Sequence, residues 1–232
     1  MRRSTYQSYK SRGLLLLSVL ISGFVSCKTS ATTDAPLGNA NLSVVNGSPN
    51  SPAINFYWTN NKFNSVPLVY GNTTGYRTLT SGLRDVQVKA SLTNKLLATG
   101  KIQVKQDSSY SLFIYEANNA VTTVIAEDDL SLPSAGNAKI KLVNLSAGLS
   151  SADLFVTDGP ELASSISFGS IGDDIELKAG TYNFDLRLHG TGTLLLNIPN
   201  VKLNNGGIYT IWSSGTVNGS GTSALSTQII TR

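Results

Sequence analysis

Serine nucleophiles are plentiful in this sequence, but residues that could activate them are few. His189 is the only histidine, so a metal site built on several histidines is excluded. A serine hydrolase would need His189 as its base, and nothing in the sequence indicates a residue that orients its ring. No Gly-x-Ser-x-Gly segment leads into a helix, because no helical pattern is present. The sequence therefore predicts no catalytic residue and no cofactor.

Acidic residues cluster at two places, 127–129 and 173–176. A glycosidase needs two carboxylates that face each other across a groove, and neighbouring acids in one turn do not provide this arrangement. Clustered carboxylates also suit Ca²⁺, but the spacing matches no calcium-binding loop. We interpret both clusters as solvated turns and expect no metal. A structural cation and catalysis are the alternatives.

Aromatic residues give the sharpest indication of binding. Strand alternation predicts that Tyr57, Phe113, Phe155 and Trp212 lie on the sheet faces that point away from the core. We expect them to form two exposed pairs, Tyr57 with Phe113 and Phe155 with Trp212. Exposed aromatic rings of this kind suit sugar stacking or a protein contact. The alternatives are that loops or the other half of the chain cover them, or that the face assignment is inverted.

Cys27 is the single cysteine, and its position indicates lipid attachment. It follows a basic segment and an apolar run at residues 14–24, which is the layout of a secretory signal peptide. The residues Phe24-Val25-Ser26-Cys27 resemble a bacterial lipobox. We therefore expect residues 1–26 to be a signal peptide and the lipid on Cys27 to hold the protein at a membrane. An ordinary signal peptide and an uncleaved anchor are the alternatives, although a membrane-spanning helix needs roughly 20 apolar residues.

The charge of the mature chain argues against nucleic-acid binding. The whole sequence has 18 Lys and Arg residues against 14 Asp and Glu residues. The predicted signal peptide holds four of the basic residues and no acid, so 14 of each sign remain. A formally neutral chain lacks the basic footprint of a nucleic-acid-binding protein.

The chain repeats itself with an offset of about 98 residues. Residues 39–46 match residues 137–144, Gly82 falls on Gly180, and after one inserted residue 110–112 fall on 209–211. A period of this length suits two tandem domains rather than a solenoid. We place the domains at residues 39–131 and 136–232, and we interpret residues 27–38 as the lipidated cysteine and its tether.

Both copies show the alternation of β-strands. Leu42 and Val44 alternate with polar residues, as do Ile140 and Leu142 in the second copy. Clusters of Asn, Gly, Ser and Pro separate such runs. Seven or eight short strands in fewer than 100 residues predict a sandwich of two antiparallel sheets. The expected fold is therefore all-β, with two tandem antiparallel β-sandwich domains of immunoglobulin-like type.

The segment 44–57 reads Val-Val-Asn-Gly-Ser-Pro-Asn-Ser-Pro-Ala-Ile-Asn-Phe-Tyr. It resembles the opening motif of a bacterial family known as domain of unknown function 4397. The Gly-Thr-Tyr-Asn-Phe segment at 180–184 also resembles the later rhythm of that family. The resemblance spans residues 39–232, although the second copy lacks both prolines. It implies a lipoprotein of the Bacteroidota type and assigns no catalytic residue.

These observations predict a lipid-anchored protein of the cell envelope that is not an enzyme. We expect it to bind or scaffold a glycan, another envelope protein or a second copy of itself. The runner-up is a carbohydrate-active hydrolase of the envelope. The expected location is the outer membrane. The lack of acids from Lys28 to Thr33 favours the periplasmic face, because surface lipoproteins of similar type often carry acids there.

Overall fold

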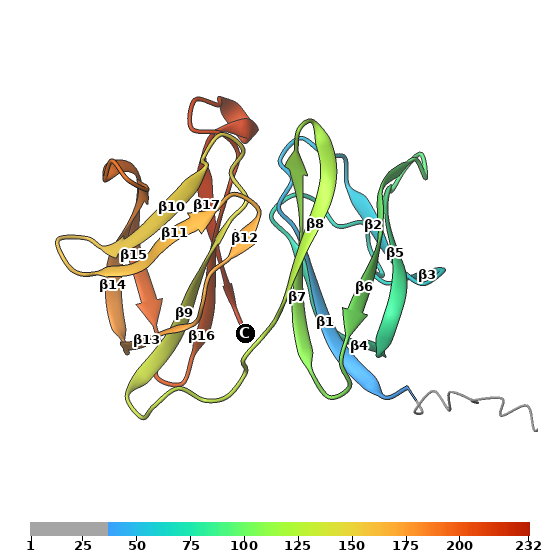
Figure 1. The fold of residues 1–232 in the computed structure, drawn as a ribbon, viewed down its shortest axis with the longest axis horizontal. Helices are drawn as coiled ribbons and strands as arrows, with labels where there is room; N and C mark the ends of the chain where they lie inside the picture. The colour runs from blue at the N-terminus through green and yellow to red at the C-terminus, as the bar shows by residue number, and fades with distance from the viewer. Residues whose placement is uncertain (1–36) are drawn as a thin grey trace, which may run out of the picture. The chain divides into compact units, whose positions relative to one another are not determined.

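The structure, a computed structural model, describes residues 37–232. Cys27 and the predicted signal peptide lie outside the described residues. Two β-sandwiches follow one another along the chain (Figure 1). The strands of the first sandwich are β1 (Asn39–Asn46), β2 (Ile54–Trp58), β3 (Asn61–Lys62), β4 (Thr73–Thr80), β5 (Gly82–Ala90), β6 (Leu96–Val104), β7 (Ser109–Ala117) and β8 (Ala120–Glu127).

The second sandwich repeats this order with small additions. Its elements are β9 (Asn137–Asn144), β10 (Ser151–Val156), β11 (Glu161–Ser167), β12 (Ser170–Ile171), β13 (Ile175–Lys178), β14 (Gly180–Leu188), β15 (Thr193–Leu203), β16 (Ile208–Ser214), the 3₁₀ turn η1 (Gly221–Ser223) and β17 (Ser226–Thr231). The predicted all-β fold of two tandem sandwiches is confirmed.

Each sandwich consists of two layers, which have four strands each in the first sandwich and five and four strands in the second. In the first sandwich the orders are β4-β1-β7-β8 and β3-β2-β5-β6. In the second they are β12-β9-β16-β17, with β13 also paired to β9, and β11-β10-β14-β15. We call the layers that contain β1 and β9 the seam sheets, and the other two layers the distal sheets.

One strand pair in each sandwich departs from the expected antiparallel arrangement. β1 runs parallel to β7, and β9 runs parallel to β16. The registers agree between the copies, because Leu42 pairs with Tyr110 and Ile140 pairs with Tyr209. A parallel pair requires a long connection, and here the strands of the distal sheet supply it.

The cores follow the alternation read from the sequence. Ile54, Phe56 and Trp58 are buried in the first sandwich, together with the inward residues of β1 and β7. The second core contains the equivalent inward residues of β9, β10, β14 and β16. Period-two alternation leaves the opposite face of every strand outside its own core. The neighbours of that outer face decide whether it meets solvent.

A buried asparagine ends the first strand of each copy. Oδ1 of Asn46 accepts a hydrogen bond from the Ser48 backbone N–H at 3.1 Å, and its Nδ2 donates to the Leu68 carbonyl at 3.0 Å. Asn144 accepts in the same way from Ser146 at 3.2 Å. An Asx turn of this type satisfies the backbone where the strand stops. The Asn in the repeated segment is therefore a turn-forming residue.

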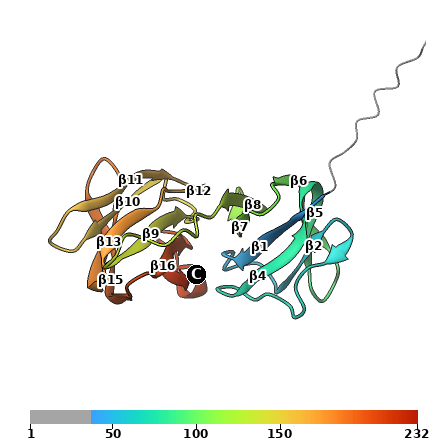
Figure 2. The ribbon, with the colours of Figure 1, turned by 90° about the horizontal axis from the view of Figure 1, so that it is seen from below.

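The seam sheets of the two sandwiches pack against each other (Figures 1 and 2). Their contact is an apolar cluster of five buried side chains, namely Val45, Phe113, Val143, Leu145 and Trp212. Residues Pro36–Arg232 accordingly form one compact unit. The domain bounds 39–131 and 136–232 stay a prediction.

Candidate functional site

Tyr57 lies on the outward face of the first distal sheet. It is partly exposed, while its neighbours Phe56 and Trp58 on β2 are buried in the core. Lys89 on β5 is partly exposed, and its Nζ lies 4.7 Å from the centre of the Tyr57 ring. Cation–π contact at this distance holds the ammonium over the ring face. The two side chains together offer an aromatic surface with a positive charge beside it.

Phe155 occupies the equivalent position on the second distal sheet. It is also partly exposed, and Cζ of Arg187 on β14 lies 4.5 Å from the centre of its ring. Tyr57 and Phe155, like Lys89 and Arg187, differ by the repeat offset of about 98 residues. The same aromatic–cation pair therefore stands on both distal sheets.

The two copies differ in how the cation is neutralised. Arg187 donates to Asp185 at 2.8 Å, whereas no carboxylate in residues 37–232 lies within 4.0 Å of the Lys89 ammonium. Burial alone would raise the pKa of Asp185, but hydrogen bonds from Arg187, Asn197 and Thr157 hold it below its ordinary value. The second surface thus carries its own counter-ion. On the first surface, the Lys89 ammonium has no carboxylate partner among the described residues and can contact a ligand.

His189 has an acidic partner that the sequence analysis did not find. Its Nδ1 lies 2.8 Å from Oδ1 of Asp153, which also accepts the Ser165 backbone N–H at 2.7 Å. The expectation that nothing orients His189 was wrong, because β10 and the turn after β14 meet only in three dimensions. Within the described residues no serine hydroxyl hydrogen-bonds the other ring nitrogen, so a catalytic triad is not assembled there.

Phe113 and Trp212 are not exposed, and this part of the expected platform was wrong. They lie on the predicted faces, away from their own cores, but are only 1% and 0% exposed. Their ring centres are 6.5 Å apart, inside the seam between the sandwiches. The expected pairing with Tyr57 and Phe155 also fails. β2 and β10 belong to the distal sheets, while β7 and β16 belong to the seam sheets.

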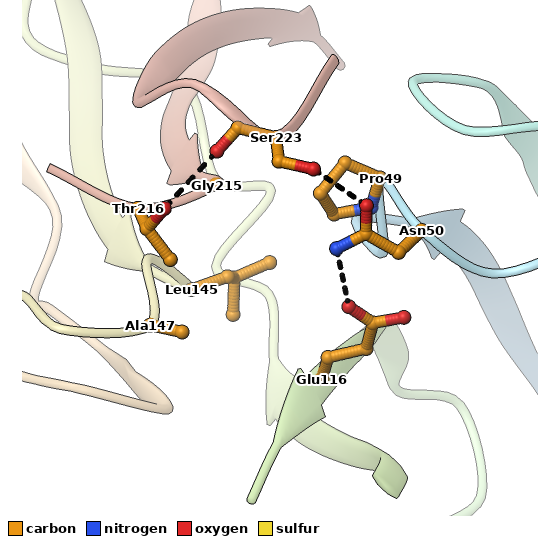
Figure 3. A pocket seen from close by; sticks show the side chains of 8 residues that line it. All are labelled: Pro49, Asn50, Glu116, Leu145, Ala147, Gly215, Thr216 and Ser223. Atoms are coloured by element: carbon orange, nitrogen blue, oxygen red, sulfur yellow. Dashed lines mark hydrogen bonds between the residues drawn. The ribbon is translucent and has the colours of Figure 1, made fainter. Parts of the chain in front are cut away.

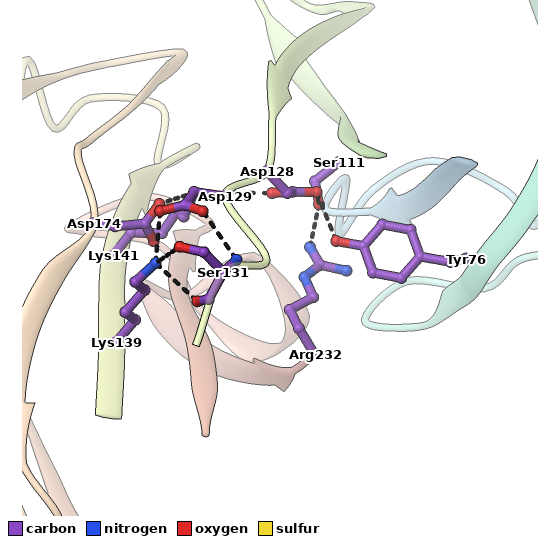
Figure 4. A network of polar contacts seen from close by, with 9 residues as sticks. All are labelled: Tyr76, Ser111, Asp128, Asp129, Ser131, Lys139, Lys141, Asp174 and Arg232. Atoms are coloured by element: carbon purple, nitrogen blue, oxygen red, sulfur yellow. Dashed lines mark hydrogen bonds and ion pairs between the residues drawn. The ribbon is translucent and has the colours of Figure 1, made fainter. Parts of the chain in front are cut away.

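Three residues of the acidic clusters, Asp128, Asp129 and Asp174, take part in the junction between the sandwiches (Figure 4), so the expectation of solvated turns was wrong for these positions, whereas Glu127, Asp173 and Glu176 are exposed. Lys141 on β9 contacts Asp174 at 2.9 Å and Asp128 at 3.8 Å. Asp128 also accepts hydrogen bonds from Tyr76 at 2.7 Å and Ser111 at 2.5 Å. The side chains of Lys141 and Asp128 are only 7% and 5% exposed, so this network fixes the linker between the sandwiches.

Two further contacts strengthen this junction. Lys139 binds Asp129 at 2.5 Å, and this hydrogen bond is the largest cause of the lowered pKa of Asp129. Arg232 reaches from the second sandwich to Ser43 at 3.0 Å and to Ser111, with its guanidinium 5.3 Å from the Tyr76 ring centre. Burial is the largest cause of the raised pKa of Tyr76, so the phenol stays protonated as a donor to Asp128.

A small cavity opens at the seam (Figure 3). Asn50 bridges it, donating to Glu116 at 3.0 Å and accepting from Ser223 at 2.6 Å. The cavity has a volume of about 30 Å³, which holds a water molecule but not a sugar ring. Its lining residues are Pro49, Asn50, Glu116, Leu145, Ala147, Gly215, Thr216 and Ser223.

No three His, Cys, Asp or Glu side chains in residues 37–232 gather as a metal site. No helix within those residues is long and apolar enough to cross a membrane.

One known protein family matches half of the chain. A model described as a domain of unknown function, DUF4397, matches residues 40–155. The chain belongs to this family. The match covers all of the first sandwich from Ala40 onward and extends into β10 of the second. No curated protein matches the chain.

Solved structures give distant likenesses to this DUF4397 chain. The C-terminal domain of AlgF from P. aeruginosa is 19% identical over 43% of this chain and all of its own, with a TM-score of 0.31. The family CBM26 protein CBMbc of Eubacterium rectale Amy13K, solved with maltoheptaose, is 13% identical over 83% of this chain and 96% of its own, with a TM-score of 0.26. A candidate cell adhesion protein of Bacteroides eggerthii is 11% identical over 85% and 96%, with a TM-score of 0.24.

The opening motif of the DUF4397 match lies partly at the seam. A Cβ added to Gly47 would stand 2.7 Å from Cδ1 of Leu145 and 3.3 Å from the Trp212 ring. Gly47 and Leu145 occupy equivalent positions in the two copies. The small residue of one copy therefore receives the large residue of the other, which explains why the copies differ there.

Proposed function

We propose that this DUF4397 protein is a non-enzymatic binding protein of the cell envelope, held to the outer membrane by a lipid on Cys27. Its distal sheets bind a glycan of the envelope. The observation that carries the proposal is the aromatic–cation pair repeated on both distal sheets, Tyr57 with Lys89 and Phe155 with Arg187.

The partial exposure of these two rings is the reason to assign them to binding. The other two outward aromatics, Phe113 and Trp212, are used to join the sandwiches. Tyr57 and Phe155 belong to neither core nor the seam cluster, although they repeat at equivalent positions. Rigid rings provide large contact area with little entropy loss on binding. Sugar rings present apolar faces that suit such a surface, and the cations and neighbouring amides suit their hydroxyls.

Hydrolysis is the less supported function. A glycosidase would need a protonated acid and a second free carboxylate across a groove. Asp153 and Asp185 lie on adjacent strands, but each is nearly buried and engaged by several donors. The lowered pKa of Asp185 is opposite to what a general acid requires. These two carboxylates instead hold other side chains in place: Asp185 binds Arg187, and Asp153 binds His189.

A glycan array probed with the full chain in detergent tests the proposal. We expect Tyr57→Ala and Phe155→Ala to weaken binding to any glycan that is retained, by about 30-fold where the ring is the main anchor. Leu92→Ala is the matched control, because Leu92 is 94% exposed on the turn between β5 and β6, away from both rings. Thermal melting checks that each variant is folded.

The outcome can contradict the proposal in two ways. The wild-type chain could retain no glycan on the array. Alternatively, both aromatic variants could fold and bind as the wild type does, which would remove the distal sheets from any binding role.

A further inference from the structure

A second surface of the first sandwich has the chemistry of an anion-binding groove. The groove lies between β3 and β4, which are edge strands of different sheets, and has a volume of about 270 Å³. Trp58 and Phe63 contribute apolar edges, and Asn61 and Thr78 contribute polar groups. This volume approaches the lower limit of small-molecule sites, which is about 300 Å³.

Two cations flank this groove, and neither has a counter-ion among the described residues. Lys62 and Arg77 are exposed, and no carboxylate in residues 37–232 lies within 4.0 Å of either charged group. Arg77 is held in place, because its Nη1 donates to the Phe63 carbonyl at 2.6 Å. Its Cζ also lies 5.6 Å from the Phe63 ring centre. The guanidinium is therefore positioned at the groove without being neutralised.

The second copy shows that the fold does not require this arginine. Arg77 pairs with Leu42 across β4 and β1, and the equivalent pair in the second copy is Ile175 with Ile140. Ile175 packs against the second core. A cation stands in the first copy where the second copy has an apolar residue. An anion-binding site present only in the first copy would explain why that copy has a cation at this position.

We infer that this groove binds the carboxylate of an acidic sugar, with Arg77 and Lys62 as its anion contacts. The fork of an arginine suits a carboxylate, and the lysine adds a mobile positive charge. Asn61 and Thr78 face the sugar hydroxyls, and the edges of Trp58 and Phe63 face its apolar side. The inference rests on the glycan-binding function proposed above and adds the charge of the ligand.

Lys62 links the groove to the first aromatic surface. Lys62 is the register partner of Tyr57 on the paired strands β2 and β3, so their side chains share a side of the sheet. Lys89 lies on the other flank of the same ring. A chain of acidic sugars could thus contact Lys89, Tyr57, Lys62 and Arg77 in turn. The second distal sheet, with Arg187 paired to Asp185, lacks this run of free cations.

Binding of a matched pair of probes to the full chain in detergent tests the inference. The probes are tetragalacturonic acid and its fully methyl-esterified form, measured by calorimetry. We expect the acid to bind more tightly than the ester, and salt to weaken only the acid. Arg77→Ile, which introduces the residue of the second copy, and Lys62→Gln should each weaken acid binding by about tenfold. Neither variant should change binding of the ester.

Lys202→Gln is the control, because it removes one exposed positive charge from β15 in the other sandwich. The same loss of acid binding in Lys202→Gln would overturn the groove as the site. Equal binding of acid and ester to the wild type, or undiminished acid binding by folded Arg77→Ile, would overturn this inference alone. Failure to bind any glycan, on the array or in these measurements, would overturn the proposed function together with it.

Discussion

Trp212 shows how one aromatic side chain can connect two repeats. Its ring contacts Phe113 in the other sandwich and makes an edge-to-face contact with Tyr70, with ring centres 6.2 Å apart. Its Nε1 is buried and donates to no acceptor among residues 37–232. Tryptophan is therefore retained here for the area that it buries rather than for its N–H group.

We expect Trp212→Ala to lower the free energy of unfolding by about 3 to 5 kcal/mol, because a large buried ring leaves a cavity. Trp212→Phe should cost less than about 1.5 kcal/mol, since it keeps a ring and removes an unpaired donor. Urea denaturation of both variants measures the difference. A Trp212→Phe variant as unstable as Trp212→Ala would show that the N–H group has a partner that stabilises the seam.

Single residues also mark the limit of what the sequence predicts. Alternation correctly placed Phe113 and Trp212 outside their own cores, because a strand has a period of two. It could not show that the two seam sheets cover each other, since that depends on tertiary packing. Asp153 beside His189 was missed for a related reason. These residues are 36 positions apart, and only the pairing of β10 with β14 brings them together.

At the scale of elements, the linker after β8 and the strand β9 form one polar junction. Lys141 lies in a strand whose neighbours are buried, and Asp128 and Asp174 approach it from the linker and from the turn before β13. A buried lysine is stable only when its charge is matched. The alternation of Lys139 and Lys141 with apolar residues suggested a solvated strand face. The linker acids explain why those lysines are nearly buried.

Removal of this lysine should therefore leave acids without their cation. We expect Lys141→Met to lower the free energy of unfolding by about 3 kcal/mol, as is typical when one partner of a buried ion pair is lost. Lys105→Met is the matched control, because the Lys105–Glu127 pair is exposed to screening solvent and its loss should cost much less stability. Urea denaturation compares them. Equal losses in the two variants would contradict a special role for the junction.

At the scale of the whole molecule, the two copies share a fold but differ in how the charges of their distal sheets are paired. The offset of about 98 residues predicted both sandwiches, but not the parallel pairing of β1 with β7 and of β9 with β16, although its register agrees between the copies. It could not predict that equivalent faces would meet, with Val45 against Val143 and Gly47 beneath Leu145. Because the seam sheets pack against each other, the distal sheets are the ones whose outer faces point to solvent. The first remains cationic, and the second is neutralised by its own acids.

The proposed anchor would place this two-sandwich unit in the envelope. β1 begins at Asn39, so residues 27–38 would separate the lipid from the first sandwich. Each buried methylene of an acyl chain contributes about 0.8 kcal/mol to membrane binding, and two or more chains anchor a protein stably. The single cysteine at position 27 is the residue that would carry them.

We expect Cys27→Ala to move the protein from the detergent phase to the aqueous phase in detergent phase partitioning, or to block removal of residues 1–26. A serine at the same position is a matched replacement, because it keeps the size of the side chain but lacks the thiol that accepts the lipid. Both variants should retain the glycan binding of the wild type when purified, since the rings and the groove lie in residues 37–232. Unchanged membrane partitioning of both variants would contradict the lipid anchor while leaving the binding surfaces to be judged by their own tests.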